Sequence, residues 1–100
     1  MVKRLRWSER ALQDKKNIFD YWNETNGNKA YSKQLNNRFN EVTELLYLFP
    51  ECGRKVDNYD ARFIVKGDYI FFYKLQVDLN ELNIDILHIW DSRRDPSSNV

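Results

Sequence analysis

The first half of the chain carries two helical patterns of hydrophobic residues. Val2 to Trp7 alternates between apolar and polar side chains, as a short strand does. From about Glu9 to about Glu24, and again from Asn28 to Pro50, apolar residues recur at steps of three and four, which places them along one face of a helix. Asn26-Gly27 separates the two runs, because glycine accepts the left-handed turn at a helix end. The pattern predicts a strand followed by an antiparallel helix hairpin.

The second half of the chain carries strand patterns. Arg62 to Lys66 and Tyr69 to Gln76 flank Gly67-Asp68, a two-residue connection whose leading glycine suits a type II′ hairpin turn. A third strand is expected from about Leu82 to Asp91. We therefore expect an α+β fold, in which the N-terminal strand joins a small, mainly antiparallel sheet and the helix hairpin packs on one face of that sheet.

Both faces of this sheet are expected to be apolar. Strict alternation sends Leu82, Ile84, Ile86 and Trp90 of the last strand to one face. The same rule sends Ile70, Phe72, Leu87 and Ile89 to the other face. Two helices can cover only one face, so the second face is shielded either by the chain's own loops or by a partner polypeptide.

Composition and length limit the possible functions. One hundred residues form one domain, which we assign to residues 1–96, with residues 97–100 as a flexible tail. The 16 basic residues nearly balance the 15 acidic ones, which argues against strong unspecific attraction to nucleic acid. No apolar run is long enough to span a membrane, and the basic N-terminus lacks the apolar segment of a secretory signal. The single Cys52 fits a reducing cytoplasm, and no metal or cofactor is expected.

Several motifs, in a fixed order, carry a family resemblance. They are Pro50-Glu51-Cys52-Gly53-Arg54, the strand-opening Arg62, Tyr69-Ile70-Phe71-Phe72-Tyr73, and a last strand that ends in Arg93-Arg94-Asp95. From Trp7 to Pro96 the chain resembles the RelE/ParE superfamily of bacterial toxins. The resemblance implies a cytoplasmic toxin that a cognate antitoxin wraps and silences, and we expect the antitoxin to contact Ile70, Phe72, Leu87 and Ile89.

The superfamily to which this resemblance points divides into two branches. One branch cleaves messenger RNA on the ribosome, and for that chemistry the candidate catalytic residues are Arg62, Arg54, Arg93 and His88. Candidate target- or phosphate-binding residues are Lys55, Arg94 and Tyr59. The structural alternatives are an Arg62 paired with Asp60 or Asp91, a hydrogen-bonded structural His88, and a solvated surface for the other cations.

Departures from the nuclease pattern favour the other branch, which poisons DNA gyrase. Asp91 occupies the position where many relatives carry histidine, and the segment before Arg62 contains Asp57 and Asp60 where potent nucleases are rich in lysine. No tyrosine or histidine follows the last strand. We therefore expect a ParE-like toxin that binds a target such as DNA gyrase. The alternatives are a ribosome-dependent endoribonuclease and a degenerate toxin that only represses its operon in complex with the antitoxin.

Overall fold

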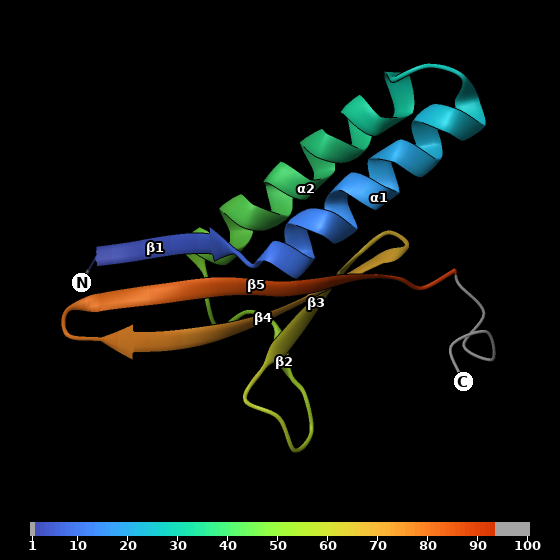
Figure 1. Ribbon diagram of the computed structural model, residues 1–100. Helices are drawn as coiled ribbons and strands as arrows, with labels where there is room; N and C mark the ends of the chain where they lie inside the picture. Colours follow the sequence, from blue (N-terminus) through green and yellow to red (C-terminus); the bar gives the residue numbers. More distant parts are fainter. Residues whose placement is uncertain (1, 94–100) are drawn as a thin grey trace.

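The computed structural model describes residues 2–93, and in this part of the chain two helices lie on one face of a twisted sheet (Figure 1). The elements are β1 (Val2–Trp7), α1 (Glu9–Asn26), α2 (Ala30–Leu48), β2 (Arg54–Lys55), β3 (Arg62–Lys66), β4 (Tyr69–Asp78) and β5 (Glu81–Asp91). The sheet order is β1-β5-β4-β3-β2, with β1 parallel to β5 and the other pairs antiparallel. The expected α+β architecture is confirmed, and the short β2 is an addition to it. The expected domain end and the tail lie outside the described residues.

Ser8 joins the start of α1 to the sheet. Its hydroxyl accepts the Ala11 N–H at 3.0 Å, as the N-cap of a helix does, and donates to the Leu87 carbonyl at 2.8 Å. The Ser8 N–H also donates to the Ile86 carbonyl. Because β1 ends at Trp7, the Ile86 and Leu87 carbonyls of β5 have no strand partner beyond this point, and Ser8 supplies their hydrogen bonds.

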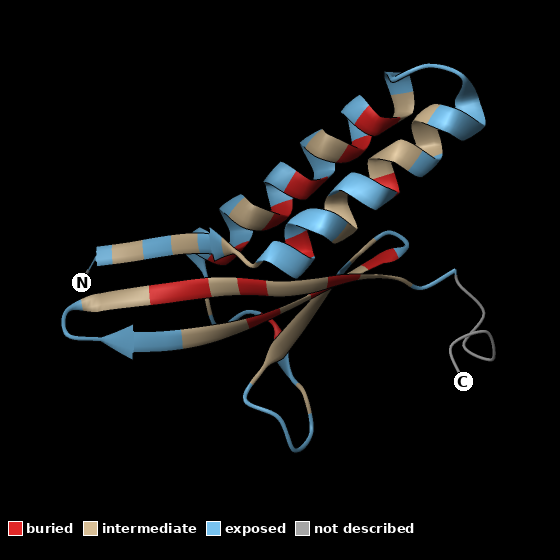
Figure 2. Cartoon of the chain, viewed as in Figure 1, coloured by how far each residue is buried: buried red, intermediate tan, exposed pale blue. Residues whose placement is uncertain are grey.

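The core lies between the helix hairpin and the near face of the sheet (Figure 2). The ring of Phe39, on α2, meets the rings of Phe71 and Tyr69 edge-on, with centroids 5.0 and 5.4 Å apart. The other buried side chains of this core are Ala11, Ile18, Leu35, Val42, Leu46, Tyr73, Ile84, Ile86 and Ile89. α2 contributes more of these core side chains than α1, which provides only Ala11 and Ile18.

A β-bulge changes which residues of β5 face the helices. The ladder pairs Tyr73 with Ile86 and Phe72 with His88, so Leu87 is an extra residue without a partner in β4. The extra residue reverses the alternation after it. Ile89 therefore lies in the core, 3% exposed, and its assignment to a partner-binding surface is wrong. Trp90, expected on the helix side, lies on the opposite face for the same reason.

The face of the sheet away from the helices is apolar, as expected, but some of the residues on it are not the expected ones. The cross-strand pairs Phe63–Phe72, Phe72–His88, Val65–Ile70 and Ile70–Trp90 place six residues on it. We call Phe63, Val65, Ile70, Phe72, His88 and Trp90 the open face. Within residues 2–93 no helix or strand covers it, as Figure 1 shows. In the same range no helix is both long and apolar enough to cross a membrane.

Candidate functional site

The open face carries a row of rings that crosses three strands. Phe72 lies between Phe63, with ring centroids 6.2 Å apart, and His88, at 6.0 Å and nearly parallel to it. Trp90 follows His88 along β5 at 6.0 Å. These rings are only partly covered by one another, and Val65 beside them is 58% exposed. A contiguous, partly exposed apolar patch of this kind is typical of a surface that binds another protein.

His88 is hydrogen-bonded to α1 and also packs against the neighbouring rings of this row. Its Nδ1 lies 2.6 Å from the Asp14 carboxylate, which also accepts the Ile89 N–H at 3.0 Å. Because a carboxylate only accepts, Nδ1 is the donor of this hydrogen bond. This geometry is that of a hydrogen-bonded structural histidine. Asp14 was missed in the sequence because 74 residues separate it from His88 and no local pattern joins them.

Arg62 binds backbone rather than a carboxylate. Its Nη1 donates to the carbonyls of Glu51 and Gly53, at 3.1 and 3.0 Å. The pairing with Asp60 or Asp91, which the sequence left open as the alternative to a catalytic role, is not seen in the described part of the chain. Gly53 is in turn held by Tyr73, whose hydroxyl accepts the Gly53 N–H at 2.8 Å. The Pro-x-x-Gly segment after α2 therefore positions Arg62.

Two of the residues predicted to bind a target or a phosphate, Lys55 and Tyr59, line one cavity together with Arg62. Lys55, Tyr59 and Arg62 line a cavity of about 310 Å³, together with Lys74, which the sequence analysis did not single out. We call these four residues the basic notch. Asp60 supplies a carboxylate beside the three cations, so the notch has an excess of positive charge and suits an anionic group. Arg54 lies in β2 opposite Phe63, exposed at the border of the open face.

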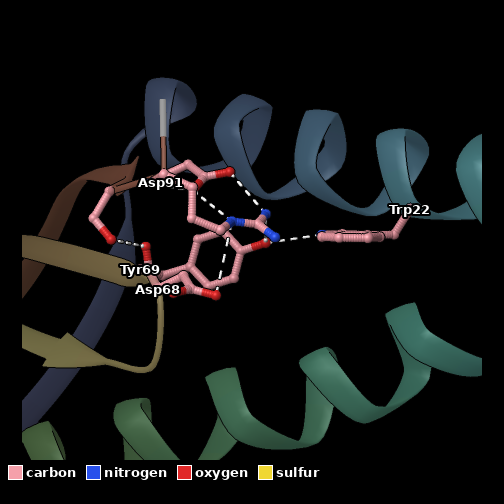
Figure 3. Close-up of polar contacts among 6 residues, drawn as sticks. Trp22, Asp68, Tyr69 and Asp91 are labelled. Carbon is pink, nitrogen blue, oxygen red and sulfur yellow. Dashed lines mark hydrogen bonds and ion pairs between the residues drawn. The ribbon is translucent and has the colours of Figure 1, made fainter. Parts of the chain in front are cut away.

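Arg93 follows the end of β5 and is held there by polar contacts with Asp91, Tyr69 and Asp68, which Figure 3 labels. Its guanidinium donates twice to Asp91, at 3.0 and 3.1 Å, and lies 4.7 Å from the ring of Trp22. It also lies 3.3 Å from the Tyr69 hydroxyl and 3.7 Å from the Asp68 carboxylate. Hydrogen bonding to Asp91 raises the pKa of Arg93. Burial raises the pKa of Tyr69, whose hydroxyl accepts the Trp22 indole N–H at 2.9 Å.

The candidate catalytic residues do not converge on one point. Arg62 stands opposite Tyr73 in the ladder, whereas Asp91, the partner of Arg93, stands opposite Tyr69. Four residues of strand separate these positions by about 13 Å. His88 is on the open face with its ring bound to α1, and Arg94 lies outside the described residues. Within residues 2–93, no group of three His, Cys, Asp or Glu side chains is arranged to hold a metal ion.

Comparisons with known proteins agree with the architecture. The family model described as "ParE toxin of type II toxin-antitoxin system, parDE" matches residues 5–96. A solved structure described as a chromosomal ParDE toxin-antitoxin system from P. aeruginosa superposes with a TM-score of 0.71 at 20% sequence identity, covering 88% of this chain and 94% of that chain. At this identity the likeness concerns the fold. No curated protein matches the sequence.

Proposed function

The chain belongs to the ParE toxin family of type II toxin-antitoxin systems, and from this premise we propose that it arrests growth by binding DNA gyrase in the cytoplasm. The observation that carries the proposal is the state of the candidate catalytic arginines. Arg62 is engaged by two carbonyls and Arg93 by a carboxylate, and the ladder positions beside them, Tyr73 and Tyr69, lie about 13 Å apart along β4. A nuclease needs such groups around one phosphate. A protein-binding toxin needs only an adhesive surface.

We propose that the antitoxin neutralises the toxin by covering the open face. Ile70 and Phe72 keep the role expected for them, and Phe63, Val65 and Trp90 join them. Leu87 is partly exposed at the bulge and borders this surface. Large apolar and aromatic side chains carry most of the binding energy at such interfaces, so the centre of the row around Phe72 is where the contact is strongest.

The basic notch favours a second candidate function. Lys55, Arg62 and Lys74 around one cavity give the excess positive charge that a phosphate requires, so a ribosome-dependent endoribonuclease is the alternative. The notch has no histidine among its lining residues to move a proton. This alternative would therefore depend on Tyr59 or on a group supplied by the ribosome.

Two assays with purified toxin separate these functions. We expect inhibition of gyrase supercoiling that disappears when the antitoxin, the product of the adjoining reading frame, is added. We expect no site-specific messenger RNA cleavage in a reconstituted translation reaction. Cleavage that is abolished by Arg62→Ala but kept in Arg38→Ala, an exposed arginine of α2, would contradict the proposal.

The open-face proposal has its own test. Phe72→Ser should weaken the toxin–antitoxin complex by about thirtyfold or more, as loss of a central aromatic contact does. Leu12→Ser is the matched control, because Leu12 is 50% exposed on α1 and is not part of the open face. Equal affinities of the two variants in isothermal titration calorimetry would exclude the open face as the antitoxin site.

A further inference from the structure

The turn between β4 and β5 places a leucine in a backbone conformation that leucine disfavours. Asp78 pairs with Glu81, so Leu79 and Asn80 form a two-residue turn. Leu79 has a φ of 53°, which lies in the left-handed region. This conformation brings the Cβ of an L-residue too close to the following carbonyl oxygen, so tight hairpin turns prefer glycine or asparagine at such a position. Leucine is therefore a strained choice here.

The other two-residue hairpin of the described chain has the residue that such a turn prefers. Lys66 pairs with Tyr69, and the turn between them begins with Gly67, whose φ is 60°. The two turns thus have similar backbone angles at the same position, but one of them carries leucine. Strained backbone is concentrated at sites that bind or react, so the Leu79 side chain points to a function outside the fold.

The Leu79 side chain contributes nothing to the core. It is 92% exposed, the highest value among the exposed large hydrophobic residues of the described chain. Val77, two residues earlier on β4, is 65% exposed, and Val2, at the start of β1, is 58% exposed. We call Val2, Val77 and Leu79 the apolar tip. Figure 2 shows the whole β4–β5 turn in the colour of exposed residues.

The apolar tip is held in place by its neighbours. The Val2 N–H donates to the Asn80 carbonyl at 3.0 Å, which ties the start of β1 to the turn, as Figure 1 shows. Arg4 of β1 pairs with Glu81, the first residue of β5, at 3.1 Å. A turn that is fixed in this way presents Leu79 in a defined orientation, which lowers the entropy that binding would cost.

We propose that Leu79 is the anchor by which the toxin docks into an apolar pocket of its target protein. A leucine that projects from a turn fits a concave site, and its full burial is worth roughly tenfold or more in affinity. Asp78 and Glu81 place two carboxylates beside it, of which Arg4 pairs with one. A basic side chain at the rim of the pocket would therefore complement the tip. The inference rests on the proposed function for the identity of the target, DNA gyrase.

A folded target suits the apolar tip better than the antitoxin or a second copy of the toxin. Phe72, at the centre of the open face, and Asp78 are six residues apart on β4, about 20 Å along the strand. An extended antitoxin segment also has no pocket to offer. A second copy would have to receive Leu79 at a site other than its own tip, and such contacts repeat head to tail instead of closing into a dimer.

Leu79→Asn tests the proposal, because asparagine removes the apolar side chain and tolerates the left-handed turn, as Asn58 does at a φ of 66°. With purified full-length protein, inhibition of gyrase supercoiling should weaken by about tenfold or more. The urea midpoint should equal or exceed that of the wild type, because the strain is relieved. The affinity for the antitoxin should change by less than about twofold.

Two further variants show whether the apolar side chain itself is responsible. Leu79→Met keeps an apolar side chain at the tip and should retain inhibition to within about threefold. Leu12→Asn is the matched control, because Leu12 is 50% exposed on α1, and it should leave inhibition unchanged.

The outcomes separate this inference from the proposed function. Equal inhibition by Leu79→Asn and the wild type overturns the inference and leaves the proposed function standing. A lower urea midpoint in Leu79→Asn overturns it as well, since the leucine would then serve the fold. Weaker antitoxin binding by Leu79→Asn, or a wild-type dimer in sedimentation that this variant dissociates, overturns it in favour of one of those partners.

Growth arrest tests the apolar tip without gyrase. If the wild type does not inhibit gyrase, the proposed function fails, and the variants are expressed without the antitoxin. Arrest that is lost in Leu79→Asn and kept in Leu12→Asn supports docking through the tip on another target protein. Equal arrest by both variants, or no arrest by the wild type, overturns the inference.

Discussion

Tyr73→Phe should destabilise the protein strongly although it removes a single oxygen atom. The Tyr73 hydroxyl accepts the Gly53 N–H and donates to the Pro50 carbonyl, each at 2.8 Å. Tyr73 is fully buried and Gly53 is buried. Phenylalanine fills the same space, so the experiment removes two hydrogen bonds without opening a cavity.

The expected cost follows from the two groups left behind. The buried Gly53 N–H without an acceptor costs about 1–3 kcal/mol, and the lost bond to Pro50, which can partly be replaced by water, about 0.5–1.5 kcal/mol. The sum is about 1.5–4.5 kcal/mol, a large share of the roughly 5–15 kcal/mol that stabilises a domain. The same change should loosen Arg62, because the Gly53 carbonyl is one of its two acceptors.

Urea unfolding followed by tryptophan fluorescence measures this loss. We expect the midpoint to fall by about 1–2 M with an unchanged slope, since the denatured states are alike. Tyr21→Phe is the matched control, because Tyr21 is 56% exposed on α1 and its loss of a hydroxyl should change the stability by less than about 0.5 kcal/mol. A Tyr73→Phe midpoint equal to that of the control would refute the reasoning.

Gly53→Ala provides an independent check on the same contact. A Cβ at Gly53 would lie 2.5 Å from the Tyr73 hydroxyl, 2.7 Å from its ring and 2.8 Å from the Phe63 carbonyl. The alanine should therefore destabilise the wild type strongly. In the Tyr73→Phe background the clash with the hydroxyl disappears while the other two remain, so the double variant should be less unstable than the sum of the single ones. Strict additivity would show that the two residues are not in contact.

Three further predictions follow from the core, the His88 contact and the buried tyrosines. Ile89→Ala should lower the free energy of unfolding by about 2–4 kcal/mol, because Ile89 is a core residue, and a loss below about 1 kcal/mol would place it at the surface. Asp14→Ala should cost about 1–3 kcal/mol by leaving the Ile89 N–H and His88 without their acceptor, and the His88 ring resonances should shift in NMR spectra. Burial raises the pKa of Tyr69 and Tyr73 above the ordinary value of 10.0, so the folded state keeps their protons longer than the unfolded state does. The stability that these two protonated hydroxyls contribute is complete below pH 10.0 and is lost as the pH rises through the folded-state pKa. The urea midpoint should therefore be lower at pH 11 than at pH 8, and the difference should be smaller in Tyr73→Phe.

The helices and long strands were predictable because each carries a strong periodic signal over many residues. The stripe of α2 and the alternation of β4 are visible in the sequence alone, and Gly67-Asp68 marks the turn between β3 and β4. Arg54–Lys55 was not predicted as a strand, because two exposed basic residues show no alternation. Their pairing with β3 depends on the tertiary position of the segment that Tyr73 holds.

The composition of the open face was only partly predictable. Ile70 and Phe72 follow strict alternation and were placed correctly. Ile89 and Trp90 come after the extra residue Leu87 and were exchanged between the faces. A bulge of this kind has no local sequence signal here, since Leu87 is as apolar as its neighbours and each register leaves an apolar residue inside.

The side-chain partners at the candidate sites were the least predictable part. His88 and Asp14 are 74 residues apart, and Tyr73 and Gly53 are 20 apart. Hydrogen bonds between such positions depend on how the elements pack, which residue type and spacing do not reveal. For Arg62 the sequence left a phosphate and a carboxylate open as partners, whereas the loop after α2 supplies two carbonyls.

The bulge at Leu87 couples the stability of the fold to the surface that it offers a partner. It lies where β1 ends and Ser8 begins α1, so the extra residue is accommodated at the only stretch of β5 that a helix, rather than a strand, borders on that side within residues 2–93. Past the bulge, Ile89 enters the core while His88 and Trp90 turn to the open face. A continuous register would bury Trp90 and expose Ile89, which would replace an aromatic surface by an aliphatic one. The bulge therefore buries Ile89 beside the start of α1 and at the same time adds His88 and Trp90 to the open face.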